Sequence, residues 1–140
     1  MSKLLFGGLI FTGILISSCS TETGVEAVNG TNPVKATYSS IATIILDNRC
    51  AKSGCHLDSQ NPHLSSSEAY DNIVSKKNAA GTLNYIEQGN PDDSYLYQKL
   101  LENGNRTGKR MPRDGETSGY LSQVELDSIR TWIENGALNN

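Results

Sequence analysis

Apolar side chains recur at helical spacing in several segments of the chain. In the first, residues 38–48, three isoleucines follow the three- and four-residue steps of one buried helix face: Ile41, Ile44 and Ile45. Leu46 adds apolar area. Ser39 or Ser40 precedes this face and is expected to cap the helix. Isoleucines this close together would also suit a strand, but no partner strand is evident nearby. The pattern therefore predicts a helix that begins at Tyr38 and ends near Asn48.

Two further helices are predicted in the middle of the chain. Ser65 is expected to cap a short helix over residues 65–74, which carries apolar residues on one side. Asn90 and Pro91 begin the next helix, because asparagine favours the cap and proline the first helical position. Two aspartates follow, and acidic groups stabilise the positive end of a helix dipole. The pair Asn103-Gly104 is expected to end this helix.

The last predicted helix has the clearest signal. Ser122-Gln-Val-Glu125 is a capping box, and it opens a helix that runs through Glu134 and stops at Gly136. Before it, residues 105–119 form a long loop rich in glycine, arginine and proline. Loops this long inside a small domain usually bind something. The predicted fold class is therefore mainly α, with long loops.

The N-terminal residues indicate export. Lys3 precedes an uncharged apolar stretch from Leu4 to Ile16, which is short for a membrane span of roughly 20 residues and suits a secretory signal. The stretch ends in Ile16-Ser-Ser-Cys19, which resembles the bacterial lipobox. That resemblance implies a signal peptide of residues 1–18 and lipidation of Cys19, which would fix the protein to the bacterial cell envelope. The residue after Cys19 is Ser20 and not aspartate, which favours the outer membrane.

The rest of the chain divides into a tether and one domain. Residues 19–36 lack helical or strand periodicity and predict a flexible tether, which leaves residues 37–140 as a small domain. The chain is only 36% hydrophobic, and the signal peptide holds much of that, so the domain has little apolar material for a core. A buried cofactor would supply what is missing. The net charge of −3, with mixed signs, does not suggest nucleic acid as a partner.

Cys50, Cys55 and His56 carry the candidate chemistry. Two cysteines followed directly by a histidine predict covalent haem attachment, with a thioether from each cysteine and the histidine as proximal iron ligand. The usual motif has two residues between the cysteines, and here there are four. Gly54 tolerates unusual dihedral angles, so the two extra residues can loop outward without moving Cys55 and His56.

Met111 is the candidate for the sixth iron ligand. It lies in a basic loop, Lys109-Arg-Met-Pro-Arg113, where a lone methionine has little role as core and a thioether would favour Fe(II). His63 is the alternative, but it follows His56 by seven residues, which is short for a chain that must pass around a porphyrin. The neighbouring cations are interpreted as a solvated loop, or as groups that pair with haem propionates or an acidic redox partner.

Together these segments resemble the small c-type cytochrome domains of the Bacteroidetes and Planctomycete type, often found on lipoproteins. The resemblance rests on five pieces in register: Cys50 to His56, Leu64 to Tyr70, Ile86 to Tyr97, Arg110-Met-Pro112, and Leu121 to Ala137. It implies a cytochrome c-like helical fold around one covalent haem c. It also implies thioethers at Cys50 and Cys55, axial His56 and axial Met111, and an electron carrier that is not an enzyme and works with a redox partner protein.

Two alternatives remain at this point. One is a haem-free surface module for binding or interaction, with a Cys50–Cys55 disulfide, which the oxidising export compartment would permit. The other is a zinc site formed by Cys50, Cys55, His56 and His63, although adjacent cysteine and histidine side chains rarely reach one tetrahedral ion.

Overall fold

The computed structural model describes residues 33–140, which belong to one compact unit, Asn32–Asn140. Its elements, in chain order, are α1 (Tyr38–Ile41), η1 (Ala42–Cys50), α2 (Ala69–Ile73), α3 (Tyr95–Leu100), α4 (Gly115–Ser118) and α5 (Gln123–Glu134). Two isolated β-bridges are the only β-type pairing among the described residues. The prediction of a mainly helical fold is thus confirmed. The predicted signal peptide, Cys19 and most of the predicted tether lie outside the described residues.

The first helix begins at Tyr38, as predicted, but its winding and its cap differ from the expectation. Thr37 caps it, and its hydroxyl oxygen accepts a hydrogen bond from the amide of Ser40 at 3.4 Å. The prediction of Ser39 or Ser40 as the cap was wrong. After four residues of α-helix the chain continues as the π-helix η1, in which amides bond to carbonyls five residues back. The helix therefore ends at Cys50, two residues beyond the predicted end.

The last helix, α5, confirms the capping-box prediction. The Ser122 hydroxyl accepts from the amide of Glu125, and the Glu125 carboxylate accepts from the amide of Ser122 at 2.7 Å. The helix ends at Glu134, as expected. Because both orphan amides are satisfied by local side chains, sequence alone was sufficient to place this terminus.

The two middle helices are shorter than predicted. Residues 65–68 and 91–93 form turns, so that α2 begins at Ala69 and α3 at Tyr95. Asn90 caps its turn rather than a helix, and its side-chain oxygen accepts from the amide of Asp93 at 3.3 Å. The helix α3 stops at Leu100 instead of Asn103, and the short helix α4 was not predicted.

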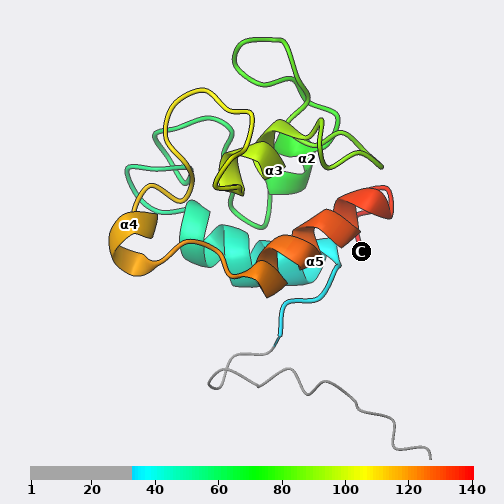
Figure 1. Ribbon diagram of the computed structural model, residues 1–140, viewed down its shortest axis with the longest axis horizontal. Coiled ribbons are helices and arrows are strands. Elements are labelled where there is room, and N and C mark those ends of the chain that lie inside the picture. Colours follow the sequence, from blue (N-terminus) through cyan, green and yellow to red (C-terminus); the bar gives the residue numbers. More distant parts are fainter. Residues whose placement is uncertain (1–32) are drawn as a thin grey trace, which may run out of the picture. The chain divides into compact units, whose positions relative to one another are not determined.

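The helix α5 contacts both α1 and α3 and organises the core (Figure 1). Five isoleucines have at most 1% of their surface exposed: Ile45, Ile73, Ile86, Ile129 and Ile133. Trp132 is also buried, and its indole nitrogen donates to the carbonyl of Leu138 at 2.8 Å. The amides of Tyr38 and Ser39 donate to Asn140, so the two ends of the described domain meet. Within residues 33–140, no helix has the length and apolar content needed to cross a membrane.

Candidate functional site

A cavity of about 710 Å³ opens among η1, the loop that follows it, α3 and the loop that carries Met111. Its lining is mostly apolar and includes the four residues that sequence analysis assigned to haem: Cys50, Cys55, His56 and Met111. Buried core residues such as Ile45 and Trp132 also contribute to the wall. The volume lies within the roughly 300–1,000 Å³ that is usual for small-molecule and cofactor sites.

The π-helix η1 explains how Cys50 comes to line this cavity. In an α-helix of 3.6 residues per turn, Cys50 lies nine residues after Ile41 and would face the opposite side. The wider winding of η1 turns nine residues through about two turns, which brings Cys50 back to the face of Ile41 and Ile45. All three residues line the cavity. Helical spacing in the sequence carried no signal of this winding.

Between the cysteines, Lys52, Ser53 and Gly54 form an exposed loop, whereas Ala51 is buried. Gly54 adopts a positive φ of 75°, which confirms the predicted use of its conformational freedom. Asp58 closes the loop, because its carboxylate accepts from the Gly54 amide at 2.9 Å and from the Ser53 hydroxyl at 3.0 Å. Hydrogen bonds from the side chain of Ser59 and then from Gly54 lower the pKa of Asp58. The longer spacing is thus accommodated without displacing Cys55 and His56 from the cavity wall.

His56 is held by its own neighbourhood. Its Nδ1 lies 2.9 Å from the carbonyl oxygen of Pro62, and a carbonyl can only accept, so Nδ1 carries the proton. The carbonyl of His56 accepts from the amide of Leu64 at 2.8 Å. In a neutral imidazole with this tautomer, Nε2 is the nitrogen that can bind a metal. A backbone carbonyl on the far nitrogen is the usual support of a metal-binding histidine.

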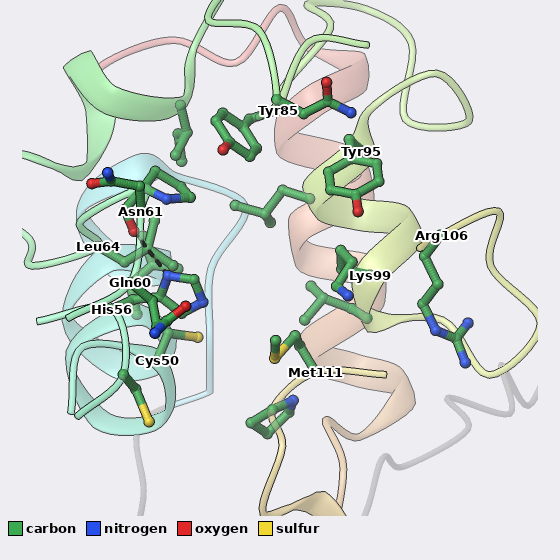
Figure 2. Close-up of a pocket in the computed structure, with 18 of the residues that line it drawn as sticks. Cys50, His56, Gln60, Asn61, Leu64, Tyr85, Tyr95, Lys99, Arg106 and Met111 are labelled. Atoms are coloured by element: carbon green, nitrogen blue, oxygen red, sulfur yellow. Dashed lines mark hydrogen bonds between the residues drawn. The ribbon is translucent and has the colours of Figure 1, made fainter. Parts of the chain in front are cut away.

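Met111 lies across the cavity from His56. Figure 2 shows the His56 side chain on one wall, with Cys50, and the Met111 side chain on the facing wall, beneath Lys99. We call these the His56 wall (residues 41–64) and the Met111 wall (residues 95–112). The Met111 amide donates to the carbonyl of Lys99 at 2.8 Å, and the Met111 side chain is half-buried against the core. The two candidate axial ligands are therefore on opposite sides of one space.

Two of the four cations of the Met111 loop hold the loop itself. Arg106 donates to the carbonyls of Leu101, Glu102 and Gly104, just beyond the end of α3. Arg110 donates to the carbonyl of Leu100 at 2.6 Å and lies over the ring of Tyr120. Cationic side chains are favourable at this end of a helix, where carbonyls lack partners. Lys109 and Arg113 remain exposed.

Both cysteines of the motif are free thiols in the structure. Burial raises the pKa of the Cys50 thiol to about 12, an effect that the neighbouring Arg49 only partly offsets. Cys50 therefore stays protonated at neutral pH.

Two alternative ligand sets are not assembled. His63, the second candidate for the sixth position, is absent from the cavity lining. Its backbone carbonyl instead accepts from the side chain of Asn72 at 3.1 Å. Within the described residues, no three histidine, cysteine or acidic side chains come together in a way that could hold a metal ion. The four residues considered for zinc are thus not gathered at one point.

Three further residues with polar groups line the cavity outside the motif. Lys99, Tyr85 and Tyr95 all line the cavity, and the two tyrosine rings lie 6.3 Å apart (Figure 2). Burial raises the pKa of Tyr85 and lowers the pKa of Lys99. Sequence analysis missed Lys99, because no motif or spacing marks it and it reaches the cavity through the packing of α3.

Comparison of the chain with family models, with curated proteins and with solved structures gave no match.

Proposed function

We propose that this protein is a membrane-anchored monohaem c-type cytochrome domain that transfers electrons. The observation that carries the proposal is the placement of His56 and Met111 on opposite walls of one cavity that both motif cysteines also line. The cytochrome c-like fold is part of the proposal, and its support is the set of sequence segments that resemble that family.

The residues present fit a covalent haem. The thiols of Cys50 and Cys55 would form the thioethers, and His56 Nε2 and the Met111 sulfur would bind iron from the two sides. Haem supplies one-electron chemistry when bound. The protein residues keep the ligands in place: Pro62 orients the imidazole, and the apolar walls limit access of water.

An electron carrier is favoured over an enzyme because both axial positions have a candidate ligand. A methionine at the sixth position keeps small molecules from the iron and favours its reduced form. No general acid–base pair stands out beside the motif, so substrate turnover at the iron has little support from the residues.

Intact mass of the mature protein tests the proposal. Protein made in a host with a cytochrome c maturation system is expected to gain the mass of one haem and to keep it under denaturation. The paired control is Cys50→Ala with Cys55→Ala, which should carry no covalent haem. Colourless wild-type protein that has lost two hydrogens would instead support the haem-free module with a Cys50–Cys55 disulfide.

Attachment to the membrane is a separate part of the proposal and depends on Cys19. We expect wild-type protein to be found in the membrane fraction. We also expect it to incorporate a labelled fatty acid. Cys19→Ser should abolish the labelling and release the protein, because a single acylated residue provides the anchor. Unchanged membrane association of the variant would contradict this assignment.

A further inference from the structure

Lys99 makes three hydrogen bonds to the loop that carries Met111. Its ammonium donates to the carbonyls of Thr107 and Lys109, each at 2.8 Å, and its own carbonyl accepts from the Met111 amide at 2.8 Å. Gly108 lies between the two carbonyls with a φ of 75°, so the chain turns around the ammonium. The stem of Lys99 also lines the cavity beside Met111 (Figure 2).

Lys99 is the α3 residue with the most hydrogen bonds to the segment 107–111. Arg106 bonds to carbonyls from Leu101 to Gly104 and fixes the start of the loop, and Arg110 bonds to the carbonyl of Leu100 at the end of α3. Two α3 residues bond to the segment 107–111: the Leu100 carbonyl accepts from the Arg110 side chain, and Lys99 makes the other three bonds. Loss of water around its ammonium accounts for the lowered pKa of Lys99, in agreement with a cation that has carbonyls in place of solvent.

We propose that Lys99 is a positioning residue that keeps the Met111 sulfur opposite His56 and so determines whether the sixth iron position is closed. The inference rests on the proposed haem function, since it concerns the ligand that Met111 would provide. An ammonium bonded to two carbonyls is a charge-assisted contact, which is stronger than a neutral hydrogen bond. Without it, the loop loses its bonds on both sides of Gly108 and Met111 keeps only its amide bond.

The test compares Lys99→Met with Lys109→Met in haem-loaded protein. Methionine keeps an unbranched stem of similar length and removes the donor, whereas Lys109 is exposed in the same loop and its side chain makes no hydrogen bond or ion pair within residues 33–140. The probe is imidazole, which binds iron only when Met111 leaves. We expect the Kd for imidazole to fall at least tenfold in Lys99→Met, together with weakening of the methionine–iron charge-transfer band. Lys109→Met and Lys99→Arg should stay within twofold of wild type.

Hydrogen exchange in haem-free protein separates this inference from the proposed function. In haem-free protein, the Met111 amide should exchange at least tenfold faster in Lys99→Met than in Lys109→Met. This measurement does not depend on haem attachment. If Lys99→Met does not fold, Lys99→Gln takes its place with the same expected direction. Wild-type imidazole affinity and wild-type exchange in the Lys99 variant would overturn the positioning role, while leaving the haem proposal intact. Absence of covalent haem with accelerated exchange would overturn the haem proposal alone.

Discussion

The His56 wall and the Met111 wall hold their candidate ligands by different means. His56 is fixed by backbone partners that lie within eight residues of it in the chain: Cys50, Pro62 and Leu64. Met111 is fixed by a loop whose shape depends on long cationic side chains that bond to carbonyls. His56 is therefore placed by residues that are near it in the sequence, and Met111 is placed by tertiary packing. Side-chain substitutions should therefore affect the two walls unequally.

Core truncation should have the largest effect, and it should differ between the walls. Ile45 has no exposed surface, so Ile45→Ala is expected to lower the free energy of unfolding by 2–5 kcal/mol, the usual cost of such a core truncation. Leu96 lines the cavity from the Met111 wall but is half-buried, and Leu96→Ala should cost about 1 kcal/mol. Urea unfolding of both variants measures the difference. Equal losses would show that the two walls contribute alike to stability.

Removal of the candidate sixth ligand should leave the protein folded and change its spectrum. Met111→Ala is expected to retain covalent haem, open the sixth position and lower the reduction potential, because a thioether ligand favours Fe(II). Axial ligands set haem potentials over about 0.8 V, so the change should be evident by spectroelectrochemistry. A reduced spectrum identical to that of the wild type would remove Met111 from the ligand set.

The two cysteines of the haem-free protein should differ in reactivity. The pKa of Cys50 is raised from 9.0 to about 12 by burial, and the thiolate is the reactive form. We expect Cys50 to react with iodoacetamide at pH 8 at least about tenfold more slowly than a thiol of ordinary pKa, which is about 8.5. Cys55, which is half-buried, provides a second rate in the same protein for comparison. Peptide mapping of the alkylated protein gives both rates.

The raised pKa of Cys50 also makes the stability of the folded protein depend on pH. The folded state keeps the thiol protonated, so this contribution is fully present below pH 9 and is lost as pH rises toward about 12. Similar alkylation rates for Cys50 and Cys55 across this range would show that the burial of Cys50 is not maintained in solution.

The smallest expected effect concerns the loop between the cysteines. The pKa of Asp58 is lowered by its hydrogen bonds, so its contribution to stability is present above its ordinary pKa and is lost as pH falls through the lowered value. Asp58→Asn should cause only a slight decrease in Tm, because the group is exposed to solvent. Faster exchange of the Gly54 amide is the specific readout. Asp71→Asn, at another exposed aspartate, should change neither quantity.

Prediction from the sequence succeeded where the signal was local. The capping box at Ser122 placed α5, and Gly54 adopts the unusual conformation expected of it. It failed where several solutions compete for the same residues: Thr37 caps the first helix although two serines stand nearby, and the turn at Asn90 does not continue directly into α3. A capping residue satisfies an amide equally well in a turn or a helix, so the local pattern could not separate them.

The candidate site divides in the same way. Cys55 and His56 are consecutive residues, so the sequence itself shows that they are neighbours. The support of Met111 by Lys99 depends on a loop that turns around the Lys99 ammonium at Gly108, which no spacing rule describes. Likewise, nothing in the pattern of isoleucines distinguishes a π-helix from an α-helix, because Ile41 and Ile45 share a face in both.

The winding of η1 makes the orientation of Cys50 sensitive to chain length. Deleting one residue between Ala42 and Asn48 would favour ordinary α-helical turns and would rotate the first thiol relative to the helices around it. Cys55 would keep its direction, because it is oriented by the loop that Asp58 closes. The two sulfurs can thus be reoriented independently. Under the proposed haem attachment, such a deletion offers a route to a protein that keeps both cysteines but forms one thioether.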